Sequence, residues 1–183
     1  MIVIADSGPI RYLVVIEQIH LLPQLYGRIV IPPSVLRELT QTATPQSVRL
    51  WVDRLPRWVT VQSPRGPVPT FPAVLGPGER EAIALAQELT ADVLLADDEA
   101  ARMEARRRNI SSQGTLGVLD LAAEHGLLAD LPAAIERLRG TNFRASKKLF
   151  DFFLSAMLPA SARIMSSAGP VGQVKGTLQR SQP

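Results

Sequence analysis

The sequence predicts an α/β protein, built as a three-layer α/β/α sandwich around a central parallel sheet. Short apolar runs alternate with segments of helical periodicity along residues 1–158. The runs are apolar throughout and do not alternate with polar residues, which is typical of strands buried on both faces. A chain of 183 residues with no internal repeat suits one such domain.

Two strand-to-helix junctions are predicted near the start of the chain. Residues 2–5 form a buried strand that ends at Asp6, and the Ser-Gly-Pro sequence after it starts a helix. Residues 28–31 form a second strand, and the Pro-Pro-Ser sequence after it starts the next helix. The apolar residues of that helix, at 35, 36 and 39, fall on one side of it.

The later elements follow the same pattern. Residues 93–96 form a third buried strand before Asp97 and Asp98, and residues 109–112 form a short fourth strand. Residues 60–77 contain five prolines and are expected to form a surface loop. Apolar residues at helical spacing predict the other helices, at 45–55, from about 79, from the acidic pair to 108, at 115–125, at 130–140 and at 146–158.

The basic character of the chain, with a pI near 9.8, is confined to its end. Residues 159–183 hold three of the 20 basic residues and no acidic residue, which leaves 17 of each sign in residues 1–158. This end is rich in Ser, Gly, Pro and Gln and lacks periodicity, so residues 159–183 are expected to be a flexible basic tail beside a domain of residues 1–158. Net charge alone therefore does not indicate nucleic-acid binding by the domain.

The composition excludes several kinds of site. The chain has no cysteine and two histidines, so disulfides, thiolate zinc sites, cysteine nucleophiles and three-histidine metal sites are excluded. No apolar run approaches the roughly 18 residues that span a bilayer. The N-terminus has no basic leader, so a cytoplasmic location without membrane contact is expected.

Carboxylates occur where parallel strands end. Asp6 follows the first strand, and the Asp97–Asp98 pair follows the third. Glu38 lies about one turn into the helix after the second strand, and Glu79 opens a helix after a Gly-Pro-Gly hinge. Ligands of open α/β sheets bind beyond the carboxyl ends of the strands, so four segments offer a carboxylate to one edge.

Such a cluster predicts a divalent metal site. Two carboxylates about 4 Å apart repel by roughly 4 kcal/mol at an effective dielectric near 20. Protons or a metal must offset this repulsion. With hard oxygen ligands and almost no histidine, Mg²⁺ or Mn²⁺ is favoured over zinc, and phosphodiester hydrolysis is the chemistry that suits these ions.

Each acidic residue also has a purely structural interpretation. Asp6 could cap the next helix, and Asp97 and Asp98 could be first-turn acids favoured by the helix dipole. Glu79 could serve the same end, and Glu38 could be a solvated helix residue. These alternatives stay open for each residue taken singly.

Four segments taken together resemble a PIN domain. They are VIADSGPI, IVIPPSVLREL, LGPGEREAIALA and VLLADDEAARMEARRRNI, followed by GTLGVLDLA, and they occur in order between about residues 2 and 150. More narrowly, they resemble proteins akin to VapC-type toxins that carry Gly-Glu in the third motif. In two departures, Gly8 stands where many members carry Ser, Thr or Asn, and Arg11 stands where an apolar residue is common.

The resemblance implies an α/β/α fold that cuts single-stranded RNA with Mg²⁺ or Mn²⁺ and leaves a 5′-phosphate and a 3′-hydroxyl. It implies a catalytic set of Asp6, Glu38, Glu79 and Asp98, and metal ligands among Asp6, Glu79, Asp97 and Asp98. Which of the two adjacent aspartates binds metal is left open. It also implies the toxin of a toxin–antitoxin pair, with an antitoxin protein as partner.

Two other functions are alternatives to a ribonuclease. A PIN fold without turnover would be an RNA- or protein-binding module, but the complete acidic set favours an enzyme. A phosphatase or receiver-like protein usually has a lysine across its acidic pocket, and the first lysine here is Lys147.

Basic and apolar segments suggest further contacts. The arginines of the helix after the acidic pair, or the acid-free stretch between Glu136 and Asp151, could bind RNA phosphates. The structural alternative for each of these basic residues is a surface cation exposed to solvent. Thr115 could orient a water or phosphate, but a helix cap is the favoured interpretation. The apolar stretch from Phe150 to Leu158 could seat a partner helix or a second subunit as a homodimer.

Overall fold

The computed structural model describes residues 1–66 and 69–155. Residues 1–145 form one compact unit, and a second unit starts at Ser146. The predicted boundary between residues 158 and 159, and the predicted tail, lie outside the described residues. None of the described helices has the length and apolar character needed to cross a membrane.

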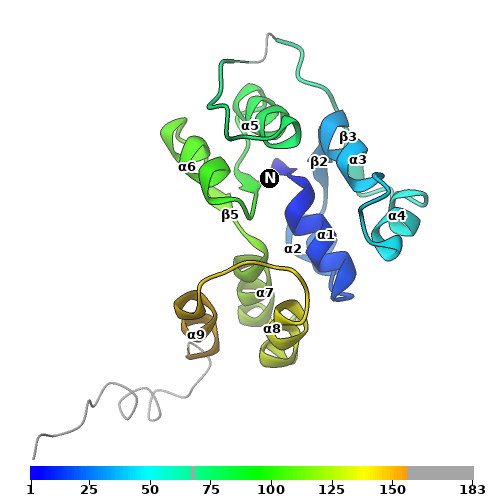
Figure 1. The fold of residues 1–183 in the computed structure, drawn as a ribbon, viewed down its shortest axis with the longest axis vertical. Helices are drawn as coiled ribbons and strands as arrows, with labels where there is room; N and C mark the ends of the chain where they lie inside the picture. The colour runs from blue at the N-terminus through cyan, green and yellow to red at the C-terminus, as the bar shows by residue number, and fades with distance from the viewer. Residues whose placement is uncertain (67–68, 156–183) are drawn as a thin grey trace, which may run out of the picture. The chain divides into compact units, whose positions relative to one another are not determined.

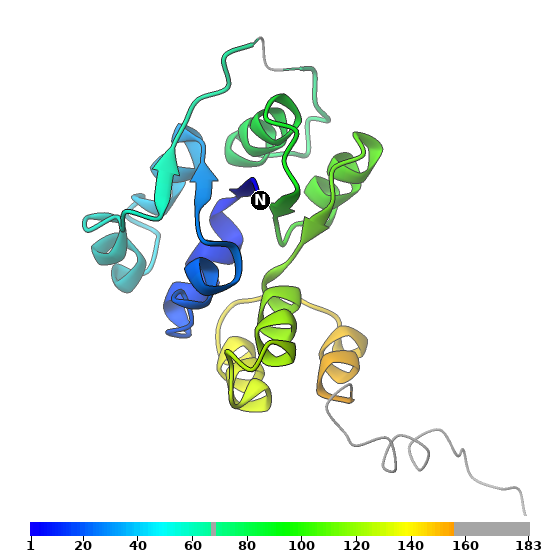
Figure 2. The same cartoon turned by 180° about the vertical axis from the view of Figure 1, so that it is seen from behind.

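The first unit contains a parallel sheet of five strands with the order β3-β2-β1-β4-β5 (Figures 1 and 2). The strands are β1 (Val3–Ala5), β2 (Ile29–Ile31), β3 (Val59–Val61), β4 (Val93–Leu95) and β5 (Ser112–Gln113). Every pair of neighbours is parallel. The predicted parallel sheet is therefore confirmed, and the first, second and third apolar runs are neighbours in it, with β1 at the centre.

Helices connect the consecutive strands, and three further helices follow the last described strand. They are α1 (Ser7–Val15), α2 (Leu21–Tyr26), α3 (Pro33–Leu39), α4 (Gln46–Val52), α5 (Pro77–Glu88), α6 (Glu99–Arg107), α7 (Thr115–Glu124), α8 (Leu131–Arg139) and, in the second unit, α9 (Lys147–Ser155). Parallel neighbours require such crossovers, because a hairpin cannot join two parallel strands.

Alternation along the strands produces three layers. Ile4, Leu94 and the partly buried Val30 pack in one apolar cluster with residues of α5 and α6, which lie side by side in Figure 1. The residues next to them in β1 and β2 are also buried, so they face the opposite layer. There α2 contacts β2 and α7. The three-layer α/β/α prediction is thereby confirmed.

Three elements differ from the prediction. The strand β3 was missed, because residues 60–77 were expected to be loop throughout. The fourth strand was predicted at 109–112 and lies at Ser112–Gln113. Asn109 has a left-handed backbone conformation (φ 59°) that ends the preceding helix, so the chain needs further residues before it joins the sheet. The short helix α2 was not predicted at all.

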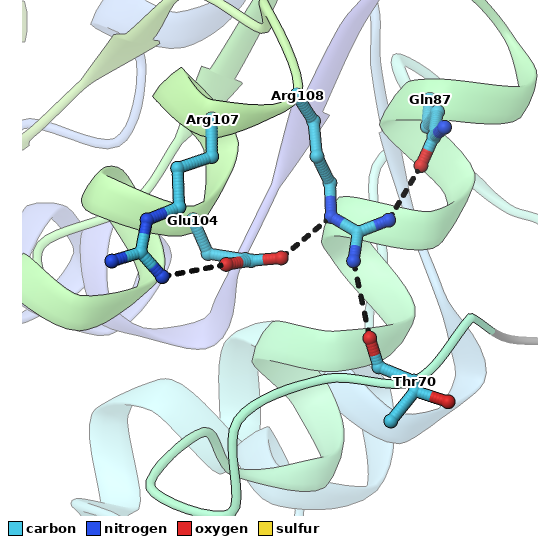
Figure 3. A network of polar contacts seen from close by, with 5 residues as sticks. All are labelled: Thr70, Gln87, Glu104, Arg107 and Arg108. Carbon is cyan, nitrogen blue, oxygen red and sulfur yellow. Dashed lines mark hydrogen bonds and ion pairs between the residues drawn. The ribbon is translucent and has the colours of Figure 1, made fainter.

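The proline-rich loop after β3 is held by Arg108 (Figure 3). Its guanidinium donates to the Thr70 carbonyl at 3.2 Å and to Gln87 Oε1 on α5 at 2.9 Å. It also pairs with Glu104 Oε1 at 2.7 Å and lies 4.3 Å from the centre of the Phe71 ring. One side chain therefore ties the loop to α5 and α6, just before the loop reaches the Gly-Pro-Gly hinge.

Candidate active site

The carboxyl ends of β1 and β4 meet at a cavity of about 440 Å³. The amide of Asp6 donates to the carbonyl of Leu95 at 2.9 Å, which fixes the end of β1 beside the end of β4. The cavity is lined by four of the predicted carboxylates, those of Asp6, Glu79, Asp97 and Asp98. Topology alone brings these together, because parallel strands end at a common edge.

Asp6 is the most deeply buried of the acids, with 5% of its surface exposed. Its Oδ1 is buried and accepts no hydrogen bond in the described part of the protein. Burial raises the pKa of this carboxyl to about 7, although the nearby amide of Ser7 opposes the shift. The carboxylates of Glu38 and Glu79 raise it further. Asp6 precedes α1 but makes no side-chain capping bond, so the capping alternative does not describe it.

Asp97 is held by Thr115. Its Oδ1 accepts the amide of Thr115 and its Oδ2 accepts the hydroxyl, both at 2.7 Å. Burial raises the pKa of Asp97, while the Thr115 bonds and the cation of Arg102 lower it. A Cβ on Gly8 would lie 3.2 Å from Oδ2 of Asp97, so Gly8 allows α1 to begin against this carboxylate. Asp97 is thus fixed in orientation at the cavity wall.

Asp98 and Glu79 both line the cavity and both serve helix starts. Asp98 caps α6, because its Oδ1 accepts the amide of Ala101 at 2.9 Å. Glu79 accepts the amide of Gly76 at 2.6 Å. Burial raises the pKa of Glu79 first of all, and the charges of Asp98 and Glu38 add to this. Both residues therefore stabilise the start of a helix and also line the common cavity.

Glu38 is the one predicted acid outside this cavity. It lines an adjoining cavity of about 320 Å³ with Ser7, which belongs to both. Its Oε2 accepts the Ser7 hydroxyl at 2.6 Å and its Oε1 accepts the Gly78 amide at 2.9 Å. A Cβ at Gly78 would lie only 2.7 Å from Cδ of Glu38, so any larger residue here would displace this carboxylate. Glu38 thereby joins three acidic motifs.

Negative charge at this edge is not balanced by ion pairs. The three ion pairs found among the described residues join arginines to Glu104 and Glu136, away from the cavity. Within residues 1–66 and 69–155, no three Asp, Glu or His side chains form a ready-made metal cluster. The unpartnered Oδ1 of Asp6 and the hard-oxygen donors nonetheless fit a cation that is bound by few carboxylates and keeps several waters, as Mg²⁺ does.

Comparison with known proteins defines the family. The family model DUF3368, described as a PIN domain, matches residues 2–158. This chain belongs to the PIN domain family. Members of this family are commonly metal-dependent nucleases.

A solved structure supports the same fold for this PIN domain. A PilT N-terminus domain protein from the hyperthermophilic archaeon Sulfolobus solfataricus superimposes with a TM-score of 0.51 at 21% sequence identity. The match covers 68% of this chain and 96% of that one. No curated protein matches the chain at a significant level.

The PIN domain's site also contains residues that were not predicted. Thr115 was expected to cap a helix, but Gly114 occupies the cap position and Thr115 binds Asp97. Ser7, which precedes Gly8, donates its hydroxyl to Glu38. Tyr12, Asn142 and Phe143 complete the cavity wall together with Arg144, which the acid-free stretch had marked as a candidate. A hydroxyl after a short strand was the available signal for Thr115, whereas no periodic pattern marks residues 142–143.

Proposed function

We propose that this PIN domain is an endoribonuclease that hydrolyses phosphodiester bonds of single-stranded RNA with Mg²⁺ or Mn²⁺. The observation that carries the proposal is the buried, unpartnered Oδ1 of Asp6 in a cavity shared with three further carboxylates. A group of this kind is destabilised by its own charge unless a cation or proton joins it.

The residues divide the work in the proposed reaction. Asp6, Glu79 and the Asp97–Asp98 pair would hold the ion, which when bound would acidify a water and neutralise phosphate charge. Asp6 must release its proton first, because burial holds its pKa near 7. Glu38 has a fixed carboxylate, and a lone pair left on each oxygen can orient the attacking water. Thr115 keeps Asp97 in position.

The test is cleavage of a labelled single-stranded RNA by purified protein, with Mn²⁺, with Mg²⁺ and with excess chelator. Cleavage is expected with either ion, with 5′-phosphate products, and loss of cleavage is expected in chelator and in Asp6→Asn. Asp53→Asn is the matched control, because Asp53 is exposed at the end of α4. Undiminished cleavage in chelator would refute the mechanism. RNA binding without any cleavage would favour the alternative, a non-catalytic binding module.

The biological role we propose is that of a toxin neutralised by an antitoxin protein. It rests on the Gly-Glu third motif, whose glutamate lines the cavity. Expression of the chain should arrest growth, and expression of Asp6→Asn at equal level should not. Equal arrest by both would contradict a nuclease toxin.

We also propose a homodimer, formed through the apolar stretch from Phe150 to Leu158. Light scattering of the full chain would test it. Residues 156–158 of this stretch lie outside the described residues.

A further inference from the structure

The acidic cavity adjoins a second one, with which it shares a lining residue. Ser7 lines both, and the second is lined also by Arg11, Glu38 and residues 39–44 after α3. The two cavities adjoin at Ser7, and we call the pair the Ser7 groove. An extended RNA strand that crosses the acidic residues can leave the acidic cavity through this adjoining one.

Each half of the Ser7 groove contains one arginine. Arg11, on α1, lines the second cavity, and Arg144, after α8, lines the acidic one. Tyr12 is close to both: Arg11 Cζ is 5.8 Å from the centre of its ring, and burial raises the pKa of its hydroxyl while the cations of Arg11 and Arg144 oppose that shift. Arg11 is half-buried and Arg144 is exposed. In the part of the chain that the structure describes, neither makes an ion pair with a carboxylate.

Three of the other arginines in the candidate segments are already engaged. Arg107 and Arg108 pair with Glu104, as Figure 3 shows. Arg139 pairs with Glu136 on the surface of α8. Arg144 is the arginine of the acid-free stretch that lines the acidic cavity, and Arg11 lines the adjoining one.

An aromatic residue is next in sequence to each of these cations. Tyr12 and Phe143 contact each other edge to face, with centroids 4.9 Å apart, and both line the acidic cavity. Cationic grooves with aromatic side chains are the usual way to hold single-stranded nucleic acid, because cations bind the phosphates and rings contact the bases. A cationic and aromatic wall beside an acidic centre suits a polyanion better than it suits a small carboxylate substrate.

We propose that Arg11 and Arg144 bind the RNA phosphates on either side of the scissile one, so that the strand runs along the Ser7 groove with a base against Tyr12. This inference rests on the proposed ribonuclease function and specifies its substrate path. It makes Arg11 and Arg144 binding residues, separate from the carboxylates that carry the chemistry.

The test measures binding of a fluorescent single-stranded RNA in chelator, where cleavage does not interfere, across a series of salt concentrations. Arg11→Ala and Arg144→Ala are compared with wild type and with Arg28→Ala. Arg28 is exposed and precedes β2, so it lies at the amino ends of the strands, whereas the groove lies at their carboxyl ends. Each groove variant should bind several-fold more weakly, and the slope of log affinity against log salt should fall by about 0.7 for each lost phosphate contact. Tyr12→Ala should weaken binding roughly tenfold, and Tyr12→Phe should not.

The outcomes separate this inference from the proposed function. Slopes and affinities of both arginine variants equal to those of Arg28→Ala overturn the groove, even if wild type cleaves RNA. If the arginine variants have reduced slopes but the wild-type protein does not cleave RNA, the groove is supported and the proposed nuclease activity is overturned. A wild-type protein that neither binds nor cleaves single-stranded RNA overturns both. Melting temperatures of the variants, expected to match wild type, confirm that they are folded.

Discussion

Asp6 illustrates how burial and charge together create a binding site. Its carboxyl pKa of about 7 lies far above its ordinary value of 3.8. The folded protein therefore holds a proton that the unfolded chain releases between these two pH values. Stability from this group is fully present below about pH 4 and is lost as the pH rises through about 7.

Metal-free protein should accordingly become less stable between pH 4 and pH 8. The slope from one such group is at most about 1.4 kcal/mol per pH unit. Asp6→Asn should be more stable than wild type at pH 8, and its stability should decline less steeply with pH. Some decline should remain, because the pKa values of Glu79 and Asp97 are raised as well. Chemical denaturation at several pH values measures this. If Asp6→Asn is no more stable than wild type at pH 8, Asp6 is not an uncompensated buried acid.

Some site residues were predictable because chain position alone determines their place. Asp6 and Asp97 follow buried strands, and parallel strands end at one edge. Thr115 was misassigned because a hydroxyl at a helix start can cap the helix or bind a neighbour, and only the fold shows that Asp97 is that neighbour. Phe143 reaches the cavity through the path of a loop, which no periodic pattern encodes.

Elements were predictable where they are buried. The strands β1, β2 and β4 are apolar because both their faces are covered, whereas β3 is an edge strand in which Val59 is buried and the next two residues are exposed. Without an apolar run, β3 resembled the proline-rich loop that follows it. The helix α2 has six residues, too few to show a helical period.

The loop between β3 and α5 should depend on Arg108. Replacement by Met removes the bonds to Thr70 and Gln87 and leaves the largely buried Glu104 without its close partner. We expect a loss of about 1–3 kcal/mol in the free energy of unfolding and faster proteolysis within the loop.

Arg107→Met provides the matched control, because Arg107 contacts the same glutamate at 3.6 Å with 68% of its side chain exposed. An exposed pair of this kind contributes little, so the control should behave as wild type. Equal behaviour of the two variants would show that the contacts of Arg108 do not hold the loop.

At the scale of the whole molecule, formal charge separates the tail from the domain. Residues 159–183 carry the excess of three positive charges, and residues 1–158 are formally neutral. Removal of residues 159–183 should leave the melting temperature and the cleavage rate largely unchanged and should weaken nonspecific RNA binding at low salt. Unfolding on truncation would show that these residues belong to the folded domain.

A titration of the metal-free protein with Mn²⁺, followed by the signal of the free ion, tests the central claim most directly, because it needs no RNA. Wild type and Asp53→Asn should bind the ion equally, and Asp6→Asn should bind it at least tenfold more weakly. Wild-type binding should be tighter at pH 8 than at pH 6, since Asp6 must lose its proton first. Equal binding by wild type and Asp6→Asn at pH 8 would contradict a metal site built on this buried carboxylate.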